Sequence, residues 1–143
     1  LPAVGRGKAG GKQTMQIHQS AEDYLETILM LNQRMGRVRS IDVVNELGYT
    51  KASVSIAMKK LRENGYIAVD GEGNLTLLEP GREIAERIYS RHRLLTHFFV
   101  QLGVDEEVAA EDACKAEHIL SEQTLEKIRE RALETDAETG SAQ

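Results

Sequence analysis

Residues 40–80, "SIDVVNELGYTKASVSIAMKKLRENGYIAVDGEGNLTLLEP", contain the pattern that decides the fold. The first eight residues repeat apolar side chains at helical spacing, at Ile41, Val44 and Leu47. Ser40 is a good N-cap residue and Gly48 is a typical residue just beyond a helix end. We therefore expect a short helix that begins at Ser40 and ends near Gly48.

A second helix is expected over "KASVSIAMKKLRENG", residues 51–65, directly after a short Tyr-Thr connection. Its apolar stripe consists of Val54, Met58 and Leu61. The other faces carry lysine, arginine and serine, so the helix is amphipathic and basic. Two short helices joined by a small turn, the second basic with hydroxyl groups near its start, are typical of a helix-turn-helix that enters the major groove of DNA.

The pattern changes after Gly65. Residues 66–81, "YIAVDGEGNLTLLEPG", alternate toward Asp70, turn through two glycines, and alternate again, which predicts a β-hairpin. A further helix, the first in the chain, is expected upstream of both, over "AEDYLETILMLNQRMG" with Ser20 as its N-cap. Three helices followed by a hairpin favour a winged helix. A winged helix that binds protein, with its lysines merely solvated, is the alternative at this point.

The remainder of the chain predicts helices only. A long helix is expected over "REIAERIYSRHRLLTHFFVQLG", followed by two helices that begin near Asp105 and Ser121. The fold class is therefore mostly α with a small β-hairpin, an N-terminal winged helix-turn-helix joined to a C-terminal helical dimerisation domain. The expected parts are a disordered arm or expression remnant at 1–15, the winged helix-turn-helix at 16–80, a linker helix with the metal-binding and dimerisation domain at 81–136, and a loose tail at 137–143.

Composition and charge limit the classes of protein to which this chain can belong. The net charge of the 143 residues is −5, yet from Gly36 to Gly65 six basic residues face only three acidic ones. One cysteine excludes an internal disulfide framework, and no apolar run approaches the roughly 20 residues that span a bilayer. The first 14 residues have no apolar core of a signal peptide, and we assign His18 to the arm. A cytoplasmic protein without a membrane partner is expected.

Residues 111–120, "EDACKAEHIL", raise the question of a metal site. On a helix, Cys114, Glu117 and His118 are spaced i, i+3 and i+4, so a thiol, a carboxylate and an imidazole share one face and can bind one ion. Ordinary helix is the alternative, because a lone cysteine is usually a small apolar residue and a glutamate is usually solvated. Asp23 and Glu26 form a second i, i+3 pair, and His92 offers another imidazole.

Three motifs together resemble the diphtheria toxin repressor and manganese transport regulator family of metal-dependent repressors. They are "AEDYLETILML", "SRHRLLTHFF" and "LGVDEEVAAEDACKAEHILSE", and the similarity runs from about Ser20 to Arg131. The resemblance implies a winged-helix repressor fused to a helical dimerisation domain, which binds a palindromic operator in double-stranded DNA as a homodimer. Larger relatives add an SH3-like domain, for which this chain has no room.

By position, the resemblance implies a primary metal site of Asp23, Cys114, Glu117 and His118, and a second site that uses Glu26 and His92. The primary set is a hybrid: manganese-type relatives have a carboxylate at the positions of both Asp23 and Cys114, and iron-type relatives have a thioether at the first and a thiol at the second. A thiol favours softer ions, so we expect Fe²⁺ first and Mn²⁺ next, with Zn²⁺, Co²⁺ or Ni²⁺ binding in vitro.

Two positions depart from the iron-type pattern. Thr96 stands where iron-type relatives carry a carboxylate, and Ala110 stands close to a position at which they carry a histidine. Their auxiliary site is therefore not reproduced here. His97 is an outside candidate for a second ion.

The expected mechanism is corepression, in which a divalent ion bridges the two domains and sets the recognition helices of a dimer for successive major grooves. Two groups of residues are expected at the DNA: Thr50, Lys51, Ala52, Ser53 and Ser55 near base edges, and Arg37, Arg39, Lys59 and Lys60, with Lys51, at phosphates. The chain is not expected to be an enzyme. The rival interpretations are a winged-helix module that binds DNA or protein without metal and, more remotely, a zinc-dependent enzyme, although no H-E-x-x-H motif is present.

Overall fold

The computed structural model describes the backbone of residues 2–142 and the side chains of residues 19–138. The chain divides into two compact units, unit 1 over Leu1–Glu86 and unit 2 over Arg87–Gln143. The division lies inside helix α4, Glu79–Gln101. Among the described residues, no helix combines the length and the apolar character that crossing a lipid bilayer would need.

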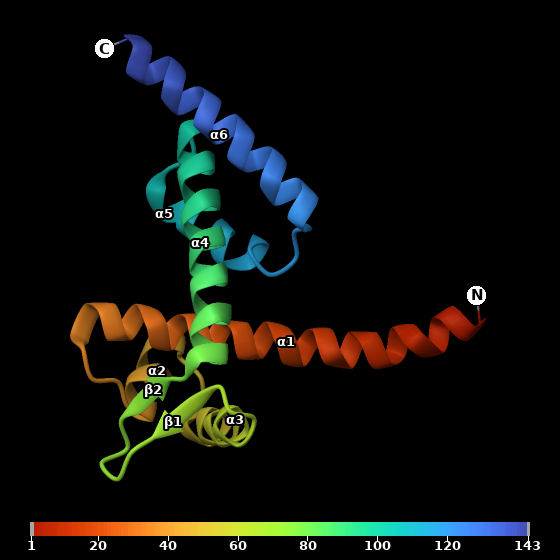
Figure 1. Cartoon of the computed structure of the whole chain (residues 1–143), viewed down its shortest axis with the longest axis vertical. Helices are drawn as coiled ribbons and strands as arrows, with labels where there is room; N and C mark the ends of the chain where they lie inside the picture. The colour runs from red at the N-terminus through yellow and green to blue at the C-terminus, as the bar shows by residue number, and fades with distance from the viewer. Residues whose placement is uncertain (1, 143) are drawn as a thin grey trace. The chain divides into compact units, whose positions relative to one another are not determined.

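Unit 1 has the helix, helix, helix, hairpin order that the sequence predicted (Figure 1). Its elements are α1 Pro2–Met35, α2 Ser40–Leu47, α3 Lys51–Glu63, β1 Ile67–Val69 and β2 Leu75–Leu77, followed by the start of α4. The two strands pair antiparallel, with Ala68 opposite Thr76. The mostly helical fold with a small β-hairpin is therefore confirmed.

Helix α1 begins earlier than expected, at Pro2 instead of at Ser20. Ser20 lies inside the helix because the residues before it, "KQTMQIHQ", are mostly good helix formers that continue the backbone hydrogen bonding upstream. The arm predicted at residues 1–15 coincides with this helical backbone. Its side chains, and that of His18, lie outside the described residues.

The N-cap of α2 is Arg39 and not Ser40. Arginine is a poor N-cap by side chain, but the Asp42 carboxylate accepts a hydrogen bond from the Arg39 backbone N–H at 2.9 Å and satisfies that donor from inside the helix. The expected end at Gly48 is confirmed: Gly48 adopts a left-handed conformation, φ 71°, and donates to the Val44 carbonyl.

The core of unit 1 holds the hairpin against the helices. Fully buried Ile28, Val43 and Val54 come from α1, α2 and α3, and Ile67 comes from β1. The hairpin is also tied to the segment between α1 and α2, because the Leu75 N–H donates to the Val38 carbonyl at 2.7 Å. The wing is therefore fixed to the helix-turn-helix by both packing and backbone hydrogen bonds.

Asp70 organises the tip of the wing. Its carboxylate accepts hydrogen bonds from the backbone N–H groups of Asn74 and Glu72, each at 2.9 Å, and from the Asn74 side-chain amide at 3.0 Å. These donors, the Asn74 backbone N–H first among them, lower the pKa of Asp70. The turn is therefore favoured when Asp70 is ionised and weakens as pH falls through its lowered pKa.

Unit 2 contains the rest of α4, then α5 Glu106–Ala116 and α6 Glu122–Ala142. Its core is Leu95 from α4, Ala113 from α5 and Leu125 from α6, with Phe99 and Ile128 packed against it. Helix α6 continues to Ala142, over the residues predicted as a loose tail, because alanine and glutamate among them favour helix. The side chains after Glu138 lie outside the described residues.

Gly81 provides a test of how α4 packs in unit 1. A Cβ at this buried glycine would lie 2.2 Å from the Tyr66 carbonyl oxygen and 3.3 Å from Leu25 Cδ2. Gly81→Ala should therefore lower the free energy of unfolding by about 1–3 kcal/mol, because backbone must move to relieve the overlap. Urea unfolding followed by circular dichroism measures the effect. Gly71→Ala is the control: its Cβ would meet nothing within 4 Å, and an equal loss in both variants would contradict this packing.

Candidate metal centre and nucleic-acid interface

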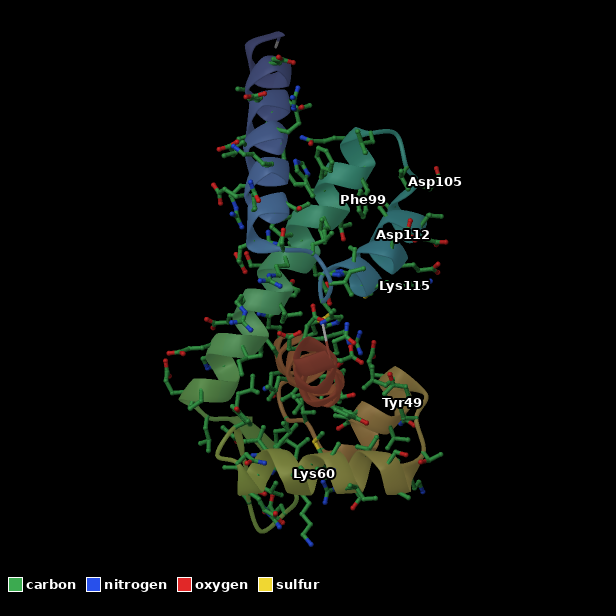
Figure 2. The ribbon with its side chains drawn as sticks, turned by 90° about the vertical axis from the view of Figure 1, so that its right-hand side faces the viewer. Tyr49, Lys60, Phe99, Asp105, Asp112 and Lys115 are labelled. Carbon is green, nitrogen blue, oxygen red and sulfur yellow. The ribbon has the colours of Figure 1, made fainter. Side chains whose placement is uncertain are left out.

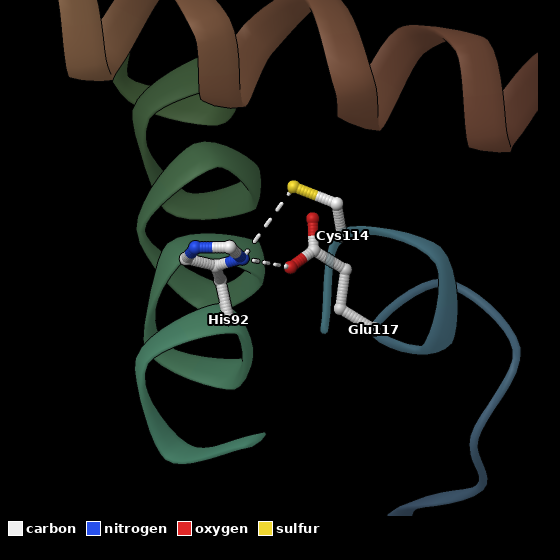
Figure 3. A group of neighbouring side chains, drawn as sticks. All are labelled: His92, Cys114 and Glu117. Carbon is white, nitrogen blue, oxygen red and sulfur yellow. Dashed lines mark hydrogen bonds and ion pairs between the residues drawn. The ribbon is translucent and has the colours of Figure 1, made fainter. Parts of the chain in front are cut away.

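Three side chains of types that can bind a metal ion meet within unit 2. His92 comes from α4, Cys114 from the last turn of α5, and Glu117 from the residue that caps α5 (Figure 3). His92 Nδ1 lies 3.0 Å from Glu117 Oε2 and 3.7 Å from Cys114 Sγ. One donor atom from each residue lies within 4.8 Å of the others, so an imidazole, a thiol and a carboxylate converge.

The end of α5 explains how Cys114 and Glu117 come together. The helix stops at Ala116, but Glu117 keeps helical dihedral angles, φ −59° and ψ −25°, and donates its N–H to the Ala113 carbonyl at 2.9 Å. The i, i+3 relation with Cys114 is therefore preserved. His118 lies in the turn beyond the helix, so the expectation that all three residues share one helix is wrong for His118.

Glu117 dominates the electrostatics of this centre, because it is completely buried. A buried carboxylate is stable only when it is paired, hydrogen-bonded or bound to a metal ion. Besides His92, the His118 imidazole lies near it, with Nε2 at 3.5 Å from Glu117 Oε1. Both imidazoles are largely buried as well, with side-chain exposures of 14% and 10%. The carboxylate thus stands between two nitrogen donors.

Arg91 is a positioning residue that the sequence reasoning missed. Its guanidinium donates to the Glu117 backbone carbonyl at 3.2 Å and forms an ion pair with Glu122 at the start of α6. It therefore holds the turn that carries Glu117 and His118. The sequence feature that could have indicated this role is that Arg91 directly precedes His92 in "SRHRLL", on the same helix.

Unit 1 contributes the carboxylates that the sequence singled out on α1. Glu26 is buried, with 4% of its surface exposed, and Asp23 is partly buried one turn earlier. Tyr49, which lies in the turn between α2 and α3 (Figure 2), donates from its hydroxyl to Asp23 Oδ2 at 3.4 Å. Burial, and then the Asp23 charge, raise the pKa of Tyr49. No sequence pattern indicated this contact between α1 and the residue before the N-cap of α3.

The donor chemistry at the centre fits a first-row divalent metal ion. Thiolate and imidazole suit Fe²⁺, Co²⁺, Ni²⁺ and Zn²⁺, and a carboxylate is also suited to Mn²⁺. His92, which the resemblance placed in a second site, lies with two residues of the primary set. His97 lies apart from them: its Nε2 is 3.0 Å from Asp136 Oδ1, and Gln101 donates to the same oxygen at 2.8 Å. His97 therefore serves a contact between α4 and α6.

The residues expected at DNA lie on the surface of unit 1. Thr50 caps α3 by accepting a hydrogen bond from the Ser53 N–H at 3.1 Å, which fixes where the helix begins. Along α3 every third or fourth residue is buried, at Val54, Met58 and Leu61. The remaining face exposes the predicted base-facing residues Lys51, Ala52, Ser53 and Ser55. This is the surface that a helix-turn-helix presents to a major groove.

The predicted phosphate contacts are also exposed side chains of unit 1. Lys59 and Lys60 are exposed on α3, where Lys60 lies at the outer edge of unit 1 (Figure 2). Arg37 is 84% exposed beside the wing, and Arg39 donates to the Glu72 carbonyl in the wing tip. Exposed lysines on α3 and exposed arginines beside the wing are side chains that can bind DNA phosphates.

Two family models match most of the chain. Residues 16–75 match the "Iron dependent repressor, N-terminal DNA binding domain", and residues 78–135 match the "Iron dependent repressor, metal binding and dimerisation domain". The transcriptional regulator MntR of Bacillus subtilis is 35% identical over 109 residues, 76% of this chain and 77% of that protein. An uncharacterised HTH-type transcriptional regulator of Methanocaldococcus jannaschii is 36% identical over 115 residues, 79% of this chain and 92% of that protein.

Solved structures give the same result. A manganese-dependent transcriptional repressor in complex with manganese has a TM-score of 0.72 and 28% identity, over 78% of this chain and 52% of that one. T. acidophilum IdeR has a TM-score of 0.71 and 25% identity, over 77% and 52%. This chain spans about half the length of these solved proteins.

Cobalt(II) provides a spectroscopic test of the centre in unit 2. Binding should produce a thiolate-to-cobalt charge-transfer absorption in an anaerobic titration, because Cys114 is the only cysteine. His92→Ala should weaken Co²⁺ binding by at least the ~10–100-fold that loss of an outer-shell partner costs, since it removes a direct donor. His97→Ala, on the same helix but outside the centre, should bind as the wild type does. A wild-type spectrum without the thiolate absorption would contradict the assignment.

Proposed function

Since this chain belongs to the diphtheria toxin repressor and manganese transport regulator family, we propose that it acts as a metal-dependent transcriptional repressor. The observation that supports this most directly is the meeting of His92, Cys114 and Glu117 in unit 2. A winged helix with an exposed basic α3 forms the other unit of the same chain. The relatives named above are transcriptional regulators, which at the level of the family supports a protein that is not an enzyme.

The proposed ligand set takes donors from both units. Cys114, Glu117 and His118, with His92 beside them, belong to unit 2, and Asp23 and Glu26 belong to unit 1. A bound divalent ion would supply the positive charge to which carboxylates from both units can bind. Without that charge, the carboxylates of Asp23 and Glu117 oppose any arrangement that brings the two units' donors together. Metal binding would in this way restrict how unit 1 is held relative to unit 2.

DNA binding would depend on that restriction. Two copies of the chain, paired through unit 2, would place two α3 helices in successive major grooves, about 34 Å apart on a palindromic operator. In any arrangement of units that does not match this spacing, only one of the two α3 helices can contact its groove, so half of the contacts with DNA are lost. A metal ion that favours the matching arrangement therefore raises DNA affinity without touching DNA itself. Such a regulator would work in the cytoplasm, where the DNA and the sensed ion are both present.

Iron is the proposed signal, with manganese next. Cys114 is exposed as a free thiol at the centre, and a thiolate favours Fe²⁺ over Mn²⁺. Asp23 and Glu117 supply oxygen donors that both ions accept. The name of the family models supports iron, whereas the regulator of Bacillus subtilis and the solved manganese complex are named for manganese.

Glu117→Gln tests the proposed function. The amide keeps the shape of the side chain but loses the charge that binds metal, so metal-stimulated DNA binding should fall by about 5–150-fold, the usual range of coupling between two sites. Fluorescence anisotropy of a labelled duplex from the protein's own promoter measures it, with light scattering to verify that the dimer persists.

Glu126→Gln is the matched control, because Glu126 is an exposed carboxylate on α6 that forms an ion pair with Arg129. It should leave metal-stimulated binding unchanged. Equal promoter affinity of Glu117→Gln and wild type at saturating metal would refute the proposed corepressor mechanism.

Cys114→Glu tests the role of the thiol. Replacing sulfur by a carboxylate should move the preference toward Mn²⁺, so the ratio of Fe²⁺ to Mn²⁺ affinity should fall by about tenfold or more. Anaerobic competition titrations against a chelator of known affinity measure the ratio. Cys114→Ser, which removes the thiolate without adding charge, separates loss of sulfur from gain of a carboxylate. An unchanged ratio in Cys114→Glu would show that the thiol does not set selectivity.

A further inference from the structure

The exposed face of α3 has an apolar centre. The buried stripe of the helix is Val54, Met58 and Leu61, and at 100° per residue the position most nearly opposite in the middle of the helix is Ile56. Ile56 is 58% exposed, which is the largest exposure among the big apolar side chains described in unit 1. Ala52, one turn earlier on the same face, is exposed as well. A short apolar strip therefore runs along the outer side of the recognition helix.

The surroundings of this strip are polar and positively charged. Ser53 and Ser55 lie on its two sides, and Lys59 and Lys60 follow in the next turn, all exposed. Among the side chains that the structure describes, Lys59 pairs with Glu63, at 4.0 Å, toward the end of the helix. A face with lysines around an apolar centre complements a polyanion that carries an apolar group in a groove.

The major groove of DNA has one apolar feature, the C5 methyl group of thymine. The side chains that distinguish bases by paired hydrogen bonds are arginine or lysine at guanine and asparagine or glutamine at adenine, and of these only lysine occurs among residues 51–60 of α3. The hydroxyl groups of Ser53 and Ser55 bond to several bases and discriminate weakly. Beyond a lysine contact to guanine, direct recognition by this helix therefore depends on apolar contact.

We propose that Ile56, supported by Ala52, is a specificity-determining residue that contacts thymine methyl groups in the operator. The inference rests on the proposed DNA-binding function and adds to it the chemical feature that the helix recognises. Ile56 buries its branched side chain against the methyl group, and the flanking lysines hold the phosphates on either side. The exposure of a large β-branched side chain at this position is then explained by its burial in the complex.

A hollow beside Ile56 offers a competing use of the residue. It has a volume of about 470 Å³ and lies between α1 and α3, with Tyr24, Ala57 and Leu61 in its lining. If Ile56 served only to cover this hollow, its truncation would change the stability of unit 1 and not the choice of base. The proposal concerns the outward side of Ile56, so its test has to separate base preference from stability.

The test uses uracil, which differs from thymine only by the absence of the methyl group. A duplex is first selected from a randomised library by metal-loaded wild-type protein, and each thymine is then replaced singly by uracil. Wild-type affinity should fall by about fourfold at one or two positions of each half-site, the equivalent of the ~0.8 kcal/mol of one buried methylene-sized group. At other thymines the affinity should not change.

Ile56→Ala should bind the thymine and uracil duplexes equally at those positions. Ile56→Val, which keeps a branched apolar side chain, should retain most of the preference for thymine. Lys59→Ala is the matched control on the same helix: it should weaken every duplex similarly, reduce the dependence on salt, and keep the thymine preference. Thermal unfolding of each variant separates a loss of stability from a loss of contact.

The outcomes are distinguishable. Metal-dependent binding that is insensitive to uracil at every position would refute the role of Ile56 and leave the proposed function intact. A uracil effect of equal size in wild type and Ile56→Ala would also refute it, because another residue would then contact the methyl group. Failure of metal-loaded protein to enrich any duplex would instead contradict the proposed function, and with it the inference that rests on it.

Discussion

The buried carboxylate of Glu117 is the constraint on which unit 2 depends. A fully buried charge needs partners, and here the imidazoles of His92 and His118 lie on its two sides. Bringing His92 to this carboxylate requires α4 to pack against the end of α5, which the Leu95, Ala113 and Leu125 core accomplishes. Arg91 fixes the same turn through the Glu117 carbonyl. The packing that folds unit 2 is therefore the same packing that brings together the side chains of the candidate metal centre.

A repressor of this kind binds metal and DNA at separate places in the chain, but the free energy of binding one has to depend on whether the other is bound. The proposed DNA-binding surface consists of α3 and the wing, and both are fixed within unit 1 by Val54, Ile67 and the hydrogen bond from Leu75 to Val38. The proposed recognition surface is therefore held by contacts within unit 1. In the proposed mechanism, metal changes how the α3 surfaces of the two copies are placed relative to each other. A modest difference in free energy between the possible placements suffices for that.

Much of unit 1 could be predicted from sequence because its signals are local. Gly48, the Thr50 cap and the alternation on either side of Asp70 lie within a few residues of the features that they specify. The N-cap of α2 was misplaced because Arg39 caps through its backbone, with Asp42 as the partner, and arginine gives no capping signal. The start of α1 was missed because Ser20 has the chemistry of a cap and lies within a sequence that continues the helix.

The candidate site was predictable only in part. The spacing of Cys114 and Glu117 is a property of one helix end, so the sequence could indicate it. The meeting of both residues with His92 depends on packing between α4 and α5, across 22 or more positions of the chain. Tyr49 at Asp23 depends likewise on how the turn after α2 packs against α1. Such contacts between distant residues leave no periodic signal.

The most direct test of the central claim is reciprocal coupling between metal and DNA. Binding of Fe²⁺ and of Mn²⁺ would be titrated anaerobically against a competing chelator, first with wild-type protein alone and then with a saturating promoter duplex. If metal raises DNA affinity by favouring one arrangement of the units, DNA has to raise metal affinity by the same factor. The account predicts tighter metal binding in the presence of the duplex. Equal metal affinities with and without DNA would contradict it.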